Sequence, residues 1–194
     1  MSRARPGLLL AFLSGGLAAG LLAPAAITAA AQEPAATAPP ERRLTMDRAE
    51  INRLLDGLHE AASKADSPTY WACFAEDAVF FGTAMEERWT VGEFREYAEP
   101  KFREGKGWAY EPKFRHVFLS PDMTVGWFDE GLQNEKYGSC RGTGVVRKID
   151  GVWRIEQYNL SVPIPNEILP KVAEMGKEIE REKQRRLRLP PTKQ

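Results

Sequence analysis

Residues 124–164 decide the fold and read TVGWFDEGLQNEKYGSCRGTGVVRKIDGVWRIEQYNLSVPI. Three runs rich in β-branched and aromatic residues alternate with turn residues, which predicts three long strands. Asp150-Gly151 is the clearest hairpin signal, since Asp-Gly favours a two-residue turn. Polar residues recur near the strand centres, and a curved sheet that turns them inward would enclose a pocket: Asp129, Glu130, Cys140, Arg141, Gln157, Tyr158 and Asn159.

The chain before this stretch has a largely helical pattern. Residues 45–66 place apolar side chains at three- and four-residue spacing, which predicts an amphipathic helix. Residues 67–74 open with Ser-Pro, a helix start signal, and carry several aromatic residues. Thr90 and Glu93 have the spacing of a capping box and predict a third helix, which Pro100 should kink or divide.

The remaining segments complete an α+β pattern. A short strand is predicted at 78–81 and a long strand at 108–119. A helix is predicted from Asn166, and this helix becomes strongly charged toward its end. Helices followed by an antiparallel sheet segregate to one of its faces. We therefore expect a cone-shaped single domain in which a strongly bent antiparallel sheet wraps around the N-terminal helices, plus a C-terminal helix.

The first 31 residues have the pattern of a secretory signal peptide. Arg3 and Arg5 precede an apolar run, and Ala29-Ala30-Ala31 supplies a cleavage site. An uncleaved membrane anchor is the weaker interpretation, because glycines and Pro24 interrupt a run that needs about 20 apolar residues to span a bilayer. The predicted organisation is a signal peptide (1–31), a disordered Pro/Ala-rich spacer (32–44), a folded domain (45–165) and a charged tail (166–194). The expected location is periplasmic or secreted, with no stable membrane span after cleavage.

The charge balance and the cysteine and histidine content limit the partners and cofactors that the sequence predicts. The chain has 27 basic and 27 acidic residues, a balance that gives no reason to expect nucleic acid or an anionic membrane as a partner. Cys73 and Cys140 either form a disulfide or remain two buried thiols, and the sequence leaves both open. Only two histidines are present, and no Cys or His cluster has ligand spacing, so neither a metal nor a cofactor is predicted.

Several segments together resemble the SnoaL-like branch of the nuclear-transport-factor-2-like superfamily. The resemblance covers roughly residues 47–166 and is carried by these segments: 70–79 (YWACFAEDAV), Thr90 with Phe94 and Tyr97, 125–130 (VGWFDE), 141–145 (RGTGV) and 150–155 (DGVWRI). It implies the bent-sheet fold and a cavity. Members include polyketide cyclases, ketosteroid-isomerase-like enzymes, dehydratases, hydrolases and proteins that only bind or dimerise. Its enzymes usually place an Asp or a His inside the cone, and the candidates here are Asp129, His116, Tyr158 and Arg141.

Strand alternation predicts which polar residues face inward. Trp153 and Ile155 are the expected core pair of the last strand, so Gln157 and Asn159 share their side and Tyr158 points outward. Hairpin counting from Asp150-Gly151 turns Cys140 inward and Arg141 outward. A one-residue bulge would reverse these choices.

On the strand of residues 125–130, Val125 and Trp127 predict that Asp129 faces inward, where an unpaired carboxylate needs a partner or a raised pKa. His116 faces either inward with Phe114 and Phe118 or outward on a dimerisation face. Asp129 with His116 would make a general-base pair for proton abstraction next to a carbonyl. His59, beside the apolar face of the first helix, is interpreted as structural.

Three functions therefore remain. The first is binding of a small, partly apolar molecule of unknown identity in an aromatic-lined cone. The second is an isomerase or cyclase-like lyase with Asp129 as base and His116, Tyr158 or Asn159 as hydrogen-bond donors. The third is a non-catalytic homodimer formed through the outer sheet face. The predicted pocket residues are aromatic side chains and polar strand residues: Tyr70, Trp71, Phe74, Trp89, Trp108, Trp127, Cys140, Arg141, Gln157, Tyr158 and Asn159.

Overall fold

The computed structural model describes residues 40–188. The predicted signal peptide and residues 32–39 of the predicted spacer lie outside the described residues and stay predictions. The rest of the spacer is helical, since the first helix begins at Pro40. Proline suits a first helical position and Glu41 follows in the first turn, where a negative charge complements the helix dipole.

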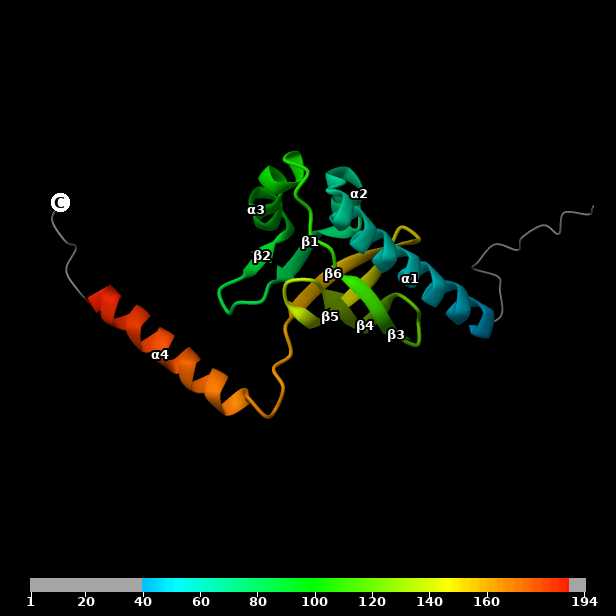
Figure 1. Ribbon diagram of the computed structural model, residues 1–194. Coiled ribbons are helices and arrows are strands. Elements are labelled where there is room, and N and C mark those ends of the chain that lie inside the picture. The colour runs from blue at the N-terminus through cyan, green and yellow to red at the C-terminus, as the bar shows by residue number, and fades with distance from the viewer. Residues whose placement is uncertain (1–39, 189–194) are drawn as a thin grey trace, which may run out of the picture. The chain divides into compact units, whose positions relative to one another are not determined.

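The described part of the chain contains a six-stranded sheet and four helices (Figure 1). The elements in chain order are α1 (Pro40–Lys64), α2 (Ser67–Ala72), β1 (Phe74–Phe81), β2 (Arg88–Thr90), α3 (Val91–Arg103), β3 (Glu111–Leu119), β4 (Val125–Asn134), β5 (Gly138–Ile149), β6 (Val152–Ser161) and α4 (Leu169–Arg188).

The sheet has the order β2-β1-β6-β5-β4-β3 and is mixed. β1 pairs with β6 in parallel, while the other neighbours pair antiparallel. The α+β class and the bent sheet are confirmed, and the expectation of a purely antiparallel sheet is wrong for this one pair. The parallel pair is possible because α3 and four further strands separate β1 from β6 along the chain, a connection long enough for a crossover.

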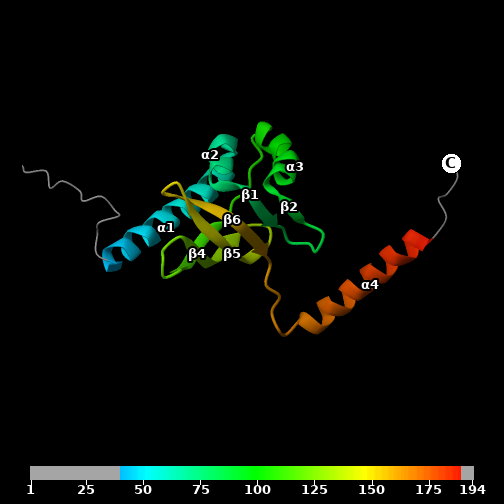
Figure 2. The ribbon, with the colours of Figure 1, turned by 180° about the vertical axis from the view of Figure 1, so that it is seen from behind.

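Helices α1, α2 and α3 lie on the same side of the curved sheet (Figures 1 and 2). α1 buries Ile51, Leu55 and Leu58 in one core cluster with Trp153 and Ile155 of β6. The N-terminal part of α1 is held by a buried Asp47, which pairs with Lys148 and accepts a hydrogen bond from Nε1 of Trp153 (3.1 Å). This packing sets the helix across the sheet and leaves the other end of the concave face for a pocket.

The predicted local signals are largely confirmed. Thr90 and Glu93 form the complete capping box of α3, which continues through Pro100 to Arg103. The hairpin at Asp150-Gly151 has positive φ at both residues (50° and 81°), as its two-residue turn requires. Cys73 and Cys140 are both buried free thiols. Of the two alternatives, a disulfide or two separate thiols, the structure has the second.

A β-bulge interrupts the pairing of β5 with β6. Val146 pairs with Ile155 as the hairpin count predicts, but Val145 then pairs with Gln157, so Glu156 is the extra residue. Gly144 consequently faces Tyr158 instead of Gln157. The bulge therefore turns Tyr158 inward and moves Gln157 and Asn159 to the other face, which corrects their predicted inward placement.

Helix α4 carries its apolar residues on its surface. Ile168, just before α4, and Met175 and Ile179 within it are about half exposed, and Lys183 pairs with Glu86 of the β1–β2 loop (2.8 Å). None of the described helices is long and apolar enough to span a membrane.

Candidate functional site

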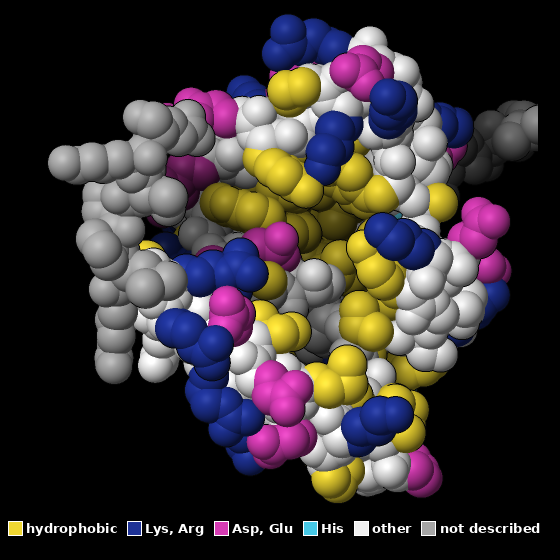
Figure 3. Space-filling view, turned by 60° about the vertical axis from the view of Figure 1, so that its left-hand side comes forward, with side chains coloured by type: hydrophobic (Ala, Val, Ile, Leu, Met, Phe, Trp, Pro, Cys, Tyr) yellow, Lys and Arg dark blue, Asp and Glu magenta, His cyan; other side chains and the backbone are white. Residues whose placement is uncertain are grey.

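An open pocket of about 210 Å³ lies between α3, the β1–β2 edge and the segment that enters β3. Figure 3 shows a hollow whose walls are hydrophobic side chains, with charged side chains at its rim. Its lining is mostly aromatic: Phe80, Gly82, Thr83, Glu87, Trp89, Phe94, Tyr97, Lys101, Trp108, Tyr110, Tyr137 and Leu160. The volume is below the roughly 300–1,000 Å³ of a drug-sized site, so the pocket suits a small molecule.

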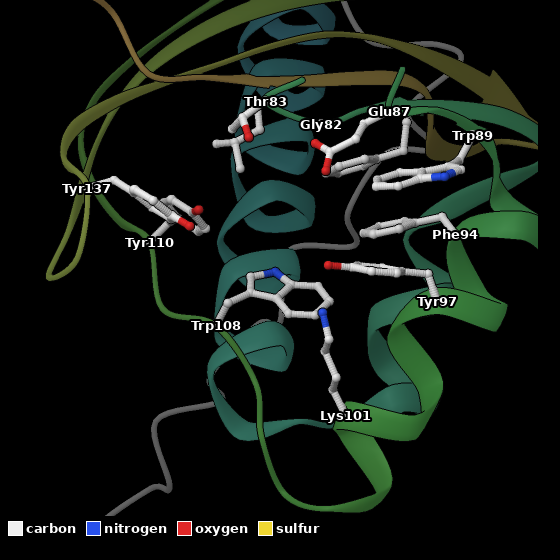
Figure 4. Close-up of a pocket in the computed structure, with 12 residues that line it drawn as sticks. Gly82, Thr83, Glu87, Trp89, Phe94, Tyr97, Lys101, Trp108, Tyr110 and Tyr137 are labelled. Carbon is white, nitrogen blue, oxygen red and sulfur yellow. The ribbon is translucent and has the colours of Figure 1, made fainter. Parts of the chain in front are cut away.

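One wall of the pocket is a stack of nearly parallel rings. Trp89 and Phe94 are 5.5 Å apart and inclined by 7°, and Trp89 and Tyr97 are 5.1 Å apart and inclined by 19°. Phe80 extends the stack from Phe94 at 4.0 Å. Figure 4 shows the ring edges of Trp89, Phe94 and Tyr97 directed at the cavity, with Trp108 and two tyrosines on other walls. Mutual contacts within the stack therefore hold these side chains in place.

A narrower space of about 20 Å³ lies next to the pocket on its interior side. It shares Phe80, Trp108, Tyr110 and Leu160 with the outer pocket and is also lined by His59 and Tyr158. The site therefore has an open aromatic mouth and, beside it, a constricted inner end whose polar side chains include His59 and Tyr158.

The inner end rests on a buried carboxylate, Glu130, whose exposure is 0%. Its Oε1 lies 2.8 Å from Nε2 of His59 and accepts a hydrogen bond from the Tyr158 hydroxyl (2.8 Å). Its Oε2 accepts a hydrogen bond from Nε of Arg115 (2.8 Å). Arg115 also pairs with Asp56 of α1 (2.8 Å). The network thus joins α1, β3, β4 and β6 through one acid.

Two glycines of β5 make room for this network. A Cβ at Gly142 would lie 2.4 Å from the Tyr158 hydroxyl and 2.7 Å from Oε1 of Glu130, and one at Gly144 would lie 2.7 Å from the Phe128 ring. Any side chain at Gly142 would therefore displace the hydrogen bond between Tyr158 and Glu130.

The ionisation states in the network follow from burial and partners. Burial by itself raises the pKa of Glu130, but His59, Arg115 and the Tyr158 hydrogen bond outweigh it and hold the pKa below its ordinary value. Burial, with the nearby Glu130 charge, raises the pKa of Tyr158 well above its ordinary value. Burial raises the pKa of Tyr110 to about 12. Glu130 is therefore ionised near neutral pH, and both tyrosines are neutral donors.

Asp129 and His116, the predicted catalytic pair, contact each other on the outer face of the sheet. His116 Nδ1 lies 3.1 Å from Asp129 Oδ1, and both side chains are solvent-accessible (60% and 43%). The inward placement of Asp129 was wrong because Trp127, used to orient the strand, is itself 48% exposed. Glu130 occupies the inner face instead, between buried Phe128 and Leu132.

The other predicted pocket residues divide into three groups. Trp89 and Trp108 line the mouth, and Tyr70, Trp108 and Tyr158 line the inner end. Trp71, Phe74 and Cys140 are buried but line neither space. The predictions are wrong for the residues that strand alternation or the bulge places on the outer face: Trp127, Arg141, Gln157 and Asn159.

Sequence reasoning missed the acid at the centre and much of the mouth. Glu130 was recognised only as a polar strand residue, and the spacing of Phe128, Glu130 and Leu132 was the signal that could have oriented it. Lys101 and Tyr97 lie one helical turn apart on α3. Because this spacing is equally common on ordinary solvent-exposed helix faces, it did not mark them as pocket residues. Among residues 40–188 no group of three or more His, Cys, Asp or Glu could hold a metal ion.

Comparison with known proteins identifies the fold. Residues 51–165 match the family model of the SnoaL-like domain. A nuclear-transport-factor-2-like protein of unknown function from Pseudomonas putida is similar, with 19% identity, 63% of this chain and 91% of that chain covered, and a TM-score of 0.54. A domain of unknown function with a cystatin-like fold from Nostoc punctiforme has 16% identity, coverages of 74% and 95%, and a TM-score of 0.56. No curated protein sequence matches the chain.

Replacing Glu130 should destabilise the fold in a pH-dependent way. We expect Glu130→Gln to lower the free energy of unfolding at pH 7 by about 3 kcal/mol, because it removes the buried carboxylate that pairs with Arg115 and leaves that charge only the exposed Asp56 as an ion-pair partner. The folded-state pKa lies below the unfolded value, so this stabilisation is present above the unfolded pKa and is lost as pH falls through the folded pKa. Urea unfolding should show the difference between the two proteins shrinking below about pH 4.

Asp129→Asn is the matched control, since it removes the neighbouring carboxylate on the opposite face of the same strand. Its solvent-accessible pair with His116 should change the free energy of unfolding by less than about 0.5 kcal/mol. Equal losses for both variants would contradict the assigned role of Glu130.

Proposed function

Because the chain belongs to the SnoaL-like domain family, we propose that it binds a small, partly apolar molecule in its aromatic pocket. The observation that carries this proposal is the cavity itself: about 210 Å³ of open space lined by stacked rings. Apolar walls with a few convergent polar groups are the usual composition of a ligand site. The polar groups here include Lys101, Glu87 and Tyr97 at the mouth and His59 and Tyr158 at the inner end.

The pocket is well suited to flat molecules. Its rings are held by one another, so binding costs little side-chain ordering. Trp108 lines both the mouth and the inner end, and it packs against Phe102 at 4.8 Å. A ligand in the cavity would therefore contact Trp108 whichever part of the cavity it occupied.

Removing Trp108 should weaken binding of an aromatic probe. We expect Trp108→Ala to reduce the affinity for 2-naphthamide, a neutral two-ring molecule, by about tenfold, through lost apolar contact. Calorimetric titration measures this change. Trp127→Ala is the matched control, because it removes the same residue type from the outer face, and it should leave the affinity unchanged. Failure of the wild-type protein to bind both 2-naphthamide and its anionic analogue 2-naphthoate would overturn the proposal.

A second candidate function is acid–base conversion of the bound molecule, favoured by the pairing of His59 with Glu130 at the inner end of the cavity. If His59 carries its proton on Nε2, directed at the carboxylate, Nδ1 is left as the basic nitrogen. The described residues offer Nδ1 no hydrogen-bond partner. In this proposal the base is His59, with Glu130 orienting it, and Asp129 is replaced in that role because it lies outside the cavity.

Proton abstraction can be tested without a known substrate. We expect the protein to accelerate exchange of the α-protons of 2-tetralone for deuterium in deuterated water, measured by NMR, because this exchange requires only a placed base. His59→Gln should remove the acceleration, while Asp129→Asn should retain it. Exchange at the buffer rate in the wild-type protein, or loss of it in Asp129→Asn alone, would contradict this role.

The outer face of the sheet supports association with a second copy of the chain. Phe114, Phe118 and Trp127 are 44–56% exposed, and the last two stack at 5.9 Å. Aromatic side chains gathered on one exposed face are typical of an interface. The flanking pair of His116 and Asp129 would then lie within or beside the contact.

The association should be visible by sedimentation. We expect a dimer at micromolar concentration, and we expect Trp127→Glu to convert it to a monomer, because a carboxylate cannot be buried at an apolar contact without a partner. Met85→Glu is the control, since it introduces the same charge at an exposed apolar residue in the β1–β2 loop. A wild-type monomer would refute the dimer.

A further inference from the structure

The pocket contains a lysine without a protein counter-charge. Nζ of Lys101 lies 3.7 Å from the centroid of the Tyr97 ring, and its side chain is half-buried in the lining of the mouth. No carboxylate among residues 40–188 lies within ion-pair distance of it. Most other lysines of the domain do pair with acids, including Lys64, Lys106, Lys113 and Lys148. A ring face stabilises the Lys101 ammonium group only in part.

The adjacent wall also favours negative charge. The rings of Trp89, Phe94 and Tyr97 point their edges at the cavity (Figure 4). A ring edge carries the positive end of the aromatic quadrupole, so it attracts an anion or the π-face of another ring. The Tyr97 hydroxyl points into the cavity on the same side as Lys101 (Figure 4) and can donate a hydrogen bond.

The one acid of the mouth, Glu87, lies at the opposite end of the ring stack from Lys101 (Figure 4). Its Oε2 accepts a hydrogen bond from the backbone N–H of Ala84 (3.1 Å), and its side chain lies against Gly82. Glu87 therefore repels an anion from that end of the pocket and does not neutralise Lys101. The charges of the two ends would orient a ligand with a single negative group.

We propose that the ligand of this pocket is an aromatic carboxylate, bound with its carboxylate at the Lys101 end and its ring against the aromatic edges. The carboxylate accepts hydrogen bonds from the Lys101 ammonium group and the Tyr97 hydroxyl. The ring lies between the stack and Trp108, directed at the inner end of the cavity. This inference rests on the proposed function of the pocket as a binding site and adds the chemical class of its ligand.

A matched pair of probes tests the charge separately from the shape. 2-Naphthoate and 2-naphthamide have nearly the same size, but only the first is an anion at neutral pH. We expect the wild-type protein to bind naphthoate about tenfold more tightly than naphthamide, as measured by calorimetry. The affinity for naphthoate should fall as salt rises, and the affinity for naphthamide should not.

Three variants locate the effect. Lys101→Met retains most of the apolar stem and should abolish the preference for naphthoate, whereas Lys101→Arg retains a positive charge and should retain a preference. Glu87→Gln removes the opposing charge and should leave naphthoate binding equal or tighter. The thermal unfolding temperature of each variant verifies that it is folded.

The outcomes separate this inference from the proposed function. Equal wild-type affinities for the two probes, or a preference that survives in Lys101→Met, would overturn the aromatic carboxylate and leave the binding pocket intact. Failure of both probes to bind would overturn the pocket itself.

Discussion

The buried carboxylate of Glu130 is the interaction on which the interior of this domain depends. An ion with no exposed surface costs several kcal/mol unless partners compensate it, and its partners here come from three other elements: His59 of α1, Arg115 of β3 and Tyr158 of β6. Each partner must lie at hydrogen-bond distance, so the separation of α1 from the sheet is set by polar contacts as well as by packing. Apolar side chains alone would permit many such separations.

The β-bulge at Glu156 brings Tyr158 to hydrogen-bond distance of Glu130. Without the extra residue Glu156, strict alternation would put Gln157 inside and Tyr158 outside, and Glu130 would lose a donor. The bulge residue pairs with Arg147 of β5, so its charge remains accommodated at the surface. Gly142 then leaves space for the Tyr158 hydroxyl to approach the acid. Bulge, glycine and carboxylate are therefore one arrangement, and each part depends on the other two.

Most elements of the fold could be predicted from sequence because their signals are local. The Thr90–Glu93 capping box and the Asp150-Gly151 turn involve residues adjacent or three apart, and both form as expected. The faces of β4 could not be assigned, since Val125 and Trp127 on one face are as apolar as Phe128 and Leu132 on the other. An outer face rich in aromatic residues removes the contrast on which alternation depends.

The bulge and the pocket were beyond prediction for a different reason. No glycine or proline marks Glu156, so nothing local distinguishes it from a regular strand residue. The mouth combines Lys101 of α3, Trp89 of β2 and Trp108 from the connection to β3. Only the tertiary fold places these side chains together. Each of them, taken alone, is compatible with an ordinary core or surface position.

The two ends of the cavity differ in charge balance, and this difference gives the pocket a direction. At the inner end the negative charge of Glu130 is already compensated by Arg115, and the Tyr158 hydroxyl already donates its proton to that acid, so the polar groups there provide no net attraction for an anion. At the mouth Lys101 is uncompensated by any acid of the described chain, and it remains near water. Desolvating an anion at the narrow inner end would cost more than leaving it half solvated beside the lysine. Under the proposed binding function, a ligand with one charged end and one apolar end would therefore enter with its apolar end first, directed toward the side lined by His59 and Tyr158.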